Sequence, residues 1–239
     1  MKLCDLTLPS PEENLALDEA LLELCESGAG DAVLRFWEPV THFVVVGYAN
    51  RAAAEVNLPC CRANHIPLLR RCTGGGTVVQ GPGCLNYWLI LRVAGSASLQ
   101  TISATNNFIL HRHKTALAEL LGQRVELEGH TDLAIGRRKF SGNSQRRRRH
   151  CLLFHGTFLL GLDLSVVEKT LRFPSKQPDY RAKRSHGDFL VNLGLRADKV
   201  KAALLETWKP TEQLAQIPLG QVDSLVREKY SRDEWNFKF

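Results

Sequence analysis

A glycine-rich stretch constrains this chain more than any other feature. Arg70 and Arg71 run into three consecutive glycines at residues 74–76, and a second glycine-rich turn precedes an apolar run at 85–91. Glycines lack a Cβ, so the backbone can adopt left-handed conformations and approach a ligand closely. Successive N–H groups in such a turn can form an anion-binding concavity. We expect a ligand-cradling loop, because a plain hairpin turn needs only one or two glycines.

The surroundings of this loop exclude two familiar phosphate loops. The spacings Gly-x-x-x-x-Gly-Lys-[Ser/Thr] and Gly-x-Gly-x-x-Gly between a strand and a helix are both absent. Residues 66–69 and 85–91 instead have the composition of short strands bounded by turn formers. The loop is therefore expected to join two β-strands, which excludes nucleotide-binding folds built on a strand–loop–helix unit.

Composition indicates a globular protein without a membrane segment. The chain has 239 residues, of which 44% are hydrophobic and 23% charged, enough for one large core. No apolar run approaches the roughly 20 residues needed to span a bilayer, and the N-terminus lacks a signal-peptide core, so we expect a cytoplasmic location. Seven irregularly spaced cysteines without a C-x-x-C pair predict mostly reduced core thiols and no structural zinc site.

Hydrophobic periodicity predicts one domain that contains both helices and strands. Ser10 and Glu13 form a capping box at the start of the first helix, and Gly122 stops the second. The expected helices are 11–25, 101–121, 198–208 and 219–230, with a short one at 52–56. The expected strands are 33–37, 42–47, 124–128, 132–135, 139–145 and 152–160. We expect a single domain over 1–239, with 190–239 as a helical C-terminal extension and no large accessory domain.

A second concentration of chemistry surrounds Lys139. Strict alternation along a strand would place Lys139, Ser141 and Asn143 on one face, presenting an ammonium, a hydroxyl and an amide to one ligand. Gly142 inside this strand suggests close approach of a backbone or ligand. The alternative is a solvated strand, which a lone lysine would by itself favour.

The arginine run at residues 146–149 raises the question of a nucleic-acid partner. No aromatic residues alternate with these arginines, and the formal net charge is only +6. Stacking platforms for bases are therefore not indicated. A solvated loop or a protein-docking surface is the favoured interpretation, and nucleic acid is not an expected partner.

Together these motifs resemble the lipoate–protein ligase A family, within the wider biotin and lipoyl protein ligase fold. The resemblance covers nearly the whole chain. It implies a biotin/lipoyl protein ligase-like catalytic domain of class α+β, in which helices flank a mixed β-sheet. The matching segments are residues 13–21, 70–78, 85–86, 139–144, 155–159 and 180–186.

The resemblance implies an enzyme that activates lipoate or octanoate with ATP and transfers the acyl group to a lysine of a lipoyl acceptor domain. Such a domain would belong to a 2-oxoacid dehydrogenase subunit or a carrier like the glycine cleavage H protein. Mg²⁺ would bind through the phosphates, with no protein metal ligand assigned. Few residues follow His186, in a family in which many ligases carry an accessory domain. The resemblance therefore leaves two alternatives open, a separate accessory subunit as a further partner or an enzyme that performs only the transfer.

The resemblance also assigns site residues. Lys139 is the expected catalytic residue, and Thr131 replaces an asparagine common in the family, which leaves a metal-binding role at that position in doubt. The expected substrate- and nucleotide-binding residues are Arg70, Arg71, Thr73, Gly74, Gly75, Gly76, Thr77, Val78, Asn86, Asp132, Ser141, Gly142, His155, Gly156 and Thr157.

Three other functions stay open on the residues alone. The first is octanoyl transfer from an acyl carrier protein through a cysteine thioester, for which Cys72, Cys84 and Cys151 are weak candidates, since buried inert thiols are commoner. Biotin ligation lacks its Gly-Arg-Gly-Arg-x-Gly loop here. The third is a non-catalytic basic binding module, which the retained Lys139 and triple glycine disfavour.

Overall fold

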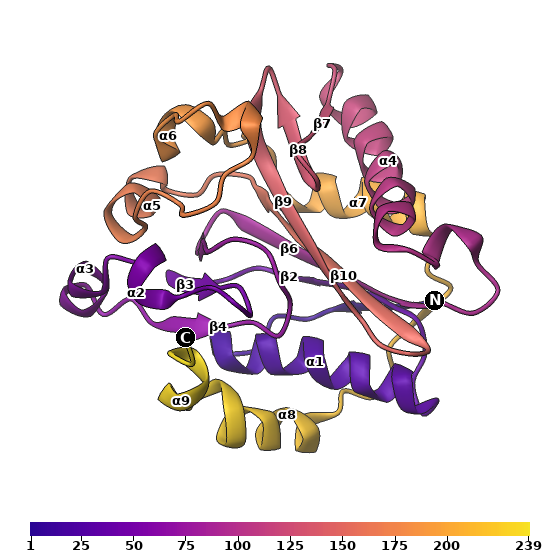
Figure 1. Ribbon diagram of the computed structural model, residues 1–239. Coiled ribbons are helices and arrows are strands. Elements are labelled where there is room, and N and C mark those ends of the chain that lie inside the picture. Colours follow the sequence, from indigo (N-terminus) through magenta and orange to yellow (C-terminus); the bar gives the residue numbers. More distant parts are fainter.

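The computed structural model describes residues 1–239, and two β-sheets form its centre (Figure 1). The parallel pairing of β1 with both of its neighbours, against antiparallel pairing elsewhere, makes the large sheet mixed, as expected. Its strands, in spatial order, are β11 (Glu212–Gln213), β1 (Lys2–Asp5), β2 (Val33–Trp37), β6 (Cys84–Arg92), β10 (Cys151–Leu159), β9 (Arg138–Arg147), β8 (Asp132–Ile135) and β7 (Glu126–Glu128). The small sheet has the order β4 (Leu68–Arg70), β3 (Phe43–Val46) and β5 (Val78–Gln80).

The two longest helices begin or end at local sequence signals, whereas the expected helix 219–230 divides into α8 and a π-helical turn. The capping box of Ser10 and Glu13 starts α1, and Gly122 ends α4 in a left-handed conformation. None of the helices combines the length and apolar character that crossing a lipid bilayer requires. The helices are α1 (Pro11–Ser27), α2 (Ala52–Glu55), α3 (Leu58–Ala63), α4 (Ile102–Leu121), α5 (Leu164–Thr170), α6 (His186–Phe189), α7 (Ala197–Trp208), α8 (Leu219–Leu225) and α9 (Asp233–Asn236), with a π-helical turn at Val226–Tyr230 and 3₁₀ turns at Ala97–Leu99 and Asp179–Arg181.

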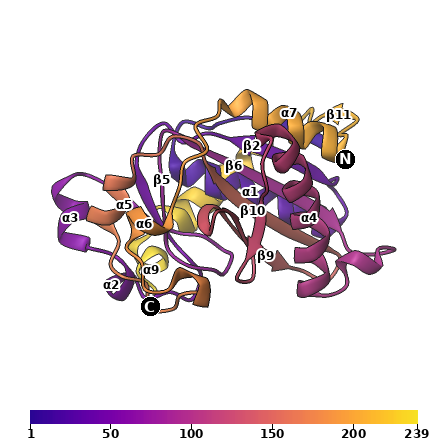
Figure 2. The same ribbon diagram turned by 90° about the horizontal axis from the view of Figure 1, so that it is seen from above.

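Helices cover both faces of the large sheet (Figures 1 and 2). On one face α1 and α8 pack over a core that includes Trp88 and Ile90 of β6. On the other face α4 and α7 pack over Tyr87 and Leu89 of the same strand. Successive side chains of β6 thus pack alternately into two separate cores, which fixes the register of this central strand.

One pair of cysteines departs from the expectation of reduced thiols. Cys25 at the end of α1 and Cys151 at the start of β10 form a disulfide, while the other five cysteines are free. A separation of 126 residues gives no spacing signal in the sequence. The disulfide joins α1 covalently to the sheet beneath it.

The arginine run lies at the turn between β9 and β10, where it meets acids of α1. Glu19 forms an ion pair with Arg146, and Glu23 forms one with Arg148. Glu26 accepts hydrogen bonds from the backbone N–H groups of residues 149–151. Arg146 and Arg148 are thus paired with acids of α1, and Glu26 holds the turn through its backbone.

Candidate active site

A β-bulge in β9 decides where the side chain of Lys139 points. The ladder pairs Leu133 with Ser141 but Ala134 with Lys139, so β9 advances two residues where β8 advances one. Phe140 is the extra residue, and such an insertion breaks the alternation of side chains along a strand. Lys139 therefore points to the face opposite to that of Ser141.

The two polar residues expected beside Lys139 lie on the other face. Ser141 is buried, and Asn143 Oδ1 accepts a hydrogen bond from the Tyr87 hydroxyl at 2.6 Å, on the side covered by α4. The prediction that Lys139, Ser141 and Asn143 share a face is wrong, because strict alternation assumes a strand without a bulge. Gly156 leaves room for the Asn143 side chain on this face, because a Cβ there would lie 1.8 Å from Asn143 Oδ1.

The Lys139 ammonium is held by a short chain of polar contacts. Its Nζ lies 2.8 Å from one carboxylate oxygen of Asp132, and the Tyr180 hydroxyl donates to the other at 2.8 Å. Burial and the neighbouring Asp132 raise the pKa of Tyr180 well above its usual value, so the hydroxyl stays a donor. A Cβ at Gly142 would lie 2.6 Å from Nζ, so glycine makes room for the amine. The Lys139 side chain remains 23% exposed and accessible to a ligand.

The glycine-rich loop, residues 71–77, joins β4 to β5, which flank β3 on opposite sides. The expectation that it joins two β-strands is confirmed, although the second strand is β5 and not the apolar run, which forms β6. The three glycines are exposed, and no backbone N–H from Thr73 to Gly76 donates a hydrogen bond within the chain. The unused N–H groups of the three exposed glycines, next to that of the buried Thr73, can bind an anion.

Arg71 gives the loop its curvature from inside. Its Nη2 donates to the carbonyls of Gly74 at 2.6 Å and Gly76 at 2.7 Å, and its Nε donates to Thr73 Oγ1 at 3.1 Å. Burial lowers the pKa of Arg71 to about 10, so it remains charged at neutral pH. Gly75 has φ +90, and a Cβ there would lie 2.9 Å from Arg71 Nη2. Only glycine fits at that position.

Arg70 is fully buried and bonds to backbone carbonyls. Its Nη1 donates to three carbonyls of the β3–α2 loop at 2.8–3.0 Å. Its Nε donates to the carbonyl of Trp235 at 2.9 Å, and its Nη2 to that of Asn236 at 3.0 Å. The structure thus places this guanidinium beneath the loop, where it fixes the loop's stem.

A closed ring of hydrogen bonds lies on the sheet face that carries Lys139. Gln80 donates to Thr157 Oγ1 at 2.7 Å, Thr157 donates to Asn86 Oδ1 at 2.5 Å, and Asn86 donates back to Gln80 Oε1 at 3.1 Å. Thr157 pairs with Gly142 across the β9–β10 ladder, so this ring lies next to the Lys139 amine. Each member orients the next, which gives the site a rigid polar floor.

His155 connects the sheet to the loop. Its ring stacks on Trp88 with centroids 4.1 Å apart, and its Nε2 lies 2.7 Å from Thr73 Oγ1. Burial, assisted by the charge of Arg71, lowers the pKa of His155 well below its usual value. The imidazole is therefore neutral at pH 7, and its Nε2 can accept a hydrogen bond from the Thr73 hydroxyl.

Three residues outside the sequence prediction complete this face. Ser144 donates to the carbonyl of Gly74 at 3.0 Å and tethers the loop to β9. Tyr180 orients Asp132, and Gln80 closes the polar ring. Ser144 and Tyr180 fall within segments of the family resemblance and could have been found there, whereas no pattern signals Gln80.

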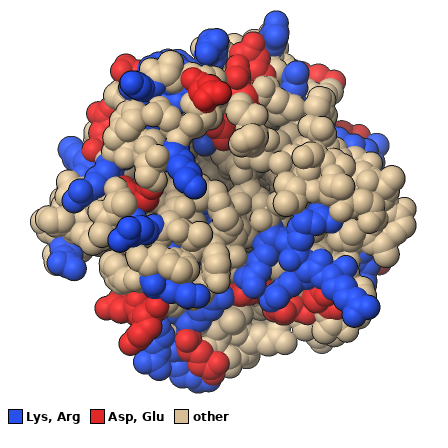
Figure 3. All heavy atoms as spheres, viewed as in Figure 1, with Lys and Arg blue, Asp and Glu red and all other residues tan.

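The structure thus brings most of the expected site residues to one face. Lys139, Asp132, Gly142, His155 and Thr157 lie beneath or beside the glycine-rich loop. Asn86 also belongs to this face, whereas Ser141 and Gly156 lie on the other, and Val78 packs against the α1 core. Thr77 accepts a hydrogen bond from Asn50 at the edge of the loop. Figure 3 shows a hollow on the face seen in Figure 1, with Lys and Arg side chains on both sides of it.

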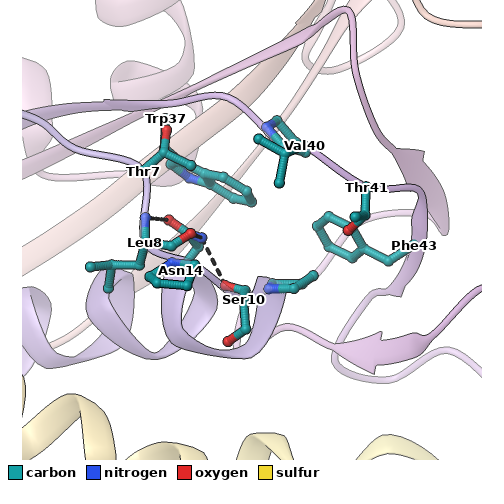
Figure 4. A pocket seen from close by; sticks show the side chains of 11 residues that line it. Thr7, Leu8, Ser10, Asn14, Trp37, Val40, Thr41 and Phe43 are labelled. Atoms are coloured by element: carbon teal, nitrogen blue, oxygen red, sulfur yellow. Dashed lines mark hydrogen bonds between the residues drawn. The ribbon is translucent and has the colours of Figure 1, made fainter.

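Two cavities elsewhere do not contain these residues. The first measures about 10 Å³ and lies beside the start of α1, where Asn14 binds the backbone of Leu8 and Ser10 (Figure 4). It has room for a single water molecule. The second, of about 420 Å³, lies between α3, β4 and the last residues of the chain.

Comparisons with a family model and with known proteins agree on one family of enzymes. The family model for the lipoyl protein ligase A/B catalytic domain matches residues 10–208. Octanoyltransferase LipM of Brevibacillus brevis is 27% identical, over 96% of this chain and 95% of its own length. A putative lipoate-protein ligase A of Aeropyrum pernix is 33% identical, over 92% and 80%. Lipoate-protein ligase A subunit 1 of Thermoplasma acidophilum is 27% identical, over 93% and 90%.

Solved structures show the same architecture. A lipoate-protein ligase A bound with ATP has a TM-score of 0.82 and 26% identity, covering 99% of this chain and 98% of its own. A bipartite lipoate protein ligase from Thermoplasma acidophilum, described with its E2 lipoyl domain, has a TM-score of 0.84 and 25% identity, covering 99% and 95%. The matched segment spans the loop, the Lys139 strand and the polar floor, and the chain is an enzyme that belongs to the lipoyl protein ligase A/B catalytic-domain family.

Proposed function

We propose that this enzyme attaches lipoate or octanoate to a lysine of a lipoyl acceptor domain, through an acyl-adenylate made from ATP. The observation that carries the proposal is the pairing of a partly exposed ammonium with an unused row of N–H donors. Lys139 and the loop meet the same sheet face, with the loop tethered at Ser144 and the amine beside Gly142. Two residues along a strand span roughly 7 Å, a distance that one acyl-adenylate can bridge.

The chemistry has two steps that these groups can assist. In the first, a carboxylate oxygen of the fatty acid attacks the α-phosphorus of ATP, and pyrophosphate leaves. In the second, the neutral amine of the acceptor lysine attacks the acyl carbonyl, the bond from the carbonyl carbon to the AMP oxygen breaks and AMP leaves, and the new amide nitrogen loses one proton to water. Negative charge gathers on phosphate and carbonyl oxygens in both steps. The Lys139 ammonium and the N–H groups of residues 73–76 supply fixed positive charge there, and binding in one place supplies proximity.

Mg²⁺ fits this site only through the nucleotide. Asp132 is the acid beside Lys139, and both of its carboxylate oxygens already accept hydrogen bonds, one from Lys139 and one from Tyr180. We therefore assign Mg²⁺ to the phosphate oxygens, where it would neutralise charge. Asp132 would then orient Lys139, because its carboxylate holds the ammonium in place across Gly142.

Transfer from an octanoyl carrier protein is the second candidate, because four relatives are named octanoyltransferase. A thioester route needs a reactive thiol in the site. Cys72 and Cys84 are buried, and burial raises the pKa of both thiols, that of Cys84 to about 12. Cys151 is bonded to Cys25. None of these four cysteines offers a reactive thiol to the site, and this favours the adenylate route.

A lipoyl domain is the proposed acceptor, and a separate accessory subunit is the proposed second partner. One relative is named subunit 1 of a lipoate-protein ligase, and one similar structure is described as bipartite and with an E2 lipoyl domain. The activation step would be the one to depend on such a subunit, because transfer from a ready-made acyl-adenylate needs only the catalytic domain.

Mass spectrometry of the acceptor tests the proposal. The purified enzyme is incubated with an apo lipoyl domain and either ATP, Mg²⁺ and lipoate or a synthetic lipoyl-adenylate. We expect the acceptor to gain one lipoyl group, at least from the adenylate. Lys139→Ala should abolish the gain, whereas Lys199→Ala, which alters an exposed lysine of α7, should leave it unchanged. No gain from lipoyl-adenylate with the wild type would refute the proposal.

A second arm separates the two candidate donors. It uses octanoyl carrier protein without ATP, together with the Cys72→Ser and Cys84→Ser variants. Transfer in this arm that disappears with a single cysteine change would establish the thioester route in place of the adenylate route.

A further inference from the structure

The last part of the chain reaches back to the stem of the glycine-rich loop. We define the C-terminal segment as residues 226–239, which comprise the π-helical turn, α9 and the final residues. It lies outside residues 10–208, which the family model matches. In Figure 1 the yellow ribbon runs below α1 and ends beside β4, the strand that enters the loop.

The first contact of the segment is with Arg70, at the entrance of the loop. Both backbone groups of Arg70 are used: its N–H donates to Asn236 Oδ1 at 2.9 Å, and its carbonyl accepts from Trp235 Nε1 at 2.8 Å. Its guanidinium donates to the carbonyls of the same two residues. Arg70 and Asn236 are 0% and 4% exposed, so these bonds are shielded from bulk solvent. Four hydrogen bonds thus join residues 165 or 166 positions apart.

The second contact runs through Glu19 of α1. The Lys229 ammonium lies 2.6 Å from a Glu19 oxygen, and the Tyr230 hydroxyl donates to the same carboxylate at 2.8 Å. Glu19 also accepts from Arg146 at 3.0 Å, and Arg146 donates to the carbonyl of Cys72 at 3.4 Å. The segment therefore contacts the loop stem directly at residue 70 and indirectly at residue 72.

We propose that the C-terminal segment is a positioning element for the substrate loop, with Trp235 and Asn236 as its positioning residues. Arg71 shapes the loop from within, and Ser144 and His155 tether it to the large sheet. The bonds at Arg70 hold the end of β4, from which the loop starts. Donors that are already aimed bind a carboxylate or phosphate without an ordering cost. This inference rests on the proposed function, since it assigns the loop to the acyl-adenylate.

Three variants and one control test the inference. Trp235→Phe removes the indole N–H while keeping an aromatic ring, and Asn236→Ala removes the acceptor for the Arg70 N–H. Asn236→Asp keeps that acceptor in place. Glu234→Ala changes an exposed residue of the same helix and serves as the control. Binding of a non-reactive sulfamoyl analogue of octanoyl-adenylate is measured by calorimetry, and transfer kinetics and melting temperature are measured in parallel.

We expect Trp235→Phe and Asn236→Ala to weaken analogue binding about tenfold and to raise KM for the acyl donor to a similar extent. KM for the acceptor domain should stay within about twofold of the wild type. Asn236→Asp should bind the analogue more tightly than Asn236→Ala, because it keeps the acceptor for the Arg70 N–H and loses only the donor to the Tyr230 carbonyl. Glu234→Ala should match the wild type. This split between two substrates is what a purely structural role would not produce.

Each other outcome has a defined meaning. Variants that melt earlier but bind the analogue as the wild type does would overturn the inference and leave the proposed function intact. Equal weakening for both substrates would also overturn it, because that pattern reports general loosening of the fold. A wild type that neither binds the analogue nor transfers an acyl group would overturn the inference together with the proposed function.

Discussion

Adding one methyl group at Gly142 should separate the activity of this enzyme from its stability. A Cβ at Gly142 would lie 2.6 Å from Lys139 Nζ and 2.8 Å from its Cε, whereas ordinary contacts are 3.4 Å or longer. The nearest other atom, Asp132 Oδ1, is 3.7 Å away. Since only the flexible end of Lys139 must move, we expect Gly142→Ala to fold and to displace the ammonium by roughly 1 Å.

The expected magnitudes differ for folding and for catalysis. Alanine in a strand is favoured over glycine by roughly 0.5–1 kcal/mol. Loss of the partly exposed Lys139–Asp132 ion pair costs up to about 1 kcal/mol. These effects oppose one another, so the free energy of unfolding should change by less than about 1 kcal/mol. A misplacement of about 1 Å in a catalytic group can lower the rate about 100-fold, which corresponds to about 2.7 kcal/mol of transition-state stabilisation.

Transfer to the apo lipoyl domain and urea unfolding are measured on the same preparations. Gly161→Ala is the matched control, because a Cβ there meets nothing within 4 Å and the residue lies outside the site. We expect Gly161→Ala to match the wild type in rate. A Gly142→Ala enzyme with full activity would refute the role assigned to Lys139. A variant that loses activity only in proportion to a large loss of stability would refute the separation.

Three further predictions concern the scaffold. Arg70→Lys should lower the free energy of unfolding by about 3 kcal/mol or more, measured in urea, because several buried carbonyls lose their donor; a change below 1 kcal/mol would contradict this. Burial lowers the pKa of His113 to about 3 from an ordinary 6.5, so below pH 6.5 the unfolded chain binds a proton that the folded chain does not. His113 should therefore cost the wild type about 1.4 kcal/mol of stability per pH unit as the pH falls from 6 toward 4, and urea unfolding of His113→Gln should lack this component. Cys151→Ser should lower stability by about 2–4 kcal/mol by breaking the disulfide with Cys25, with transfer unaffected at 25 °C; loss of transfer without loss of stability would indicate a thioester.

Local signals in the sequence were sufficient for most elements of this fold. The capping box at Ser10 and the stop at Gly122 act within one helical turn, and α1 and α4 follow them closely. The triple glycine predicted an exposed loop between two strands, and the structure has one. Lys139 was singled out by its motif together with the neighbouring glycine, and the two do lie in contact. Such signals work because caps, turns and periodicity depend on residues a few positions apart.

Tertiary structure alone decided which way the site residues point. The bulge at Phe140 is a shift in the pairing of β8 with β9, and it turns Lys139 away from Ser141. Arg70 bonds to Trp235 and Asn236, about 165 residues later in the chain, and Cys25 bonds to Cys151, 126 residues later. No periodicity within a segment contains such contacts, because they form only when separate elements pack together. The sequence thus singled out the residues that we propose to carry the chemistry, and packing determined their direction and what supports them.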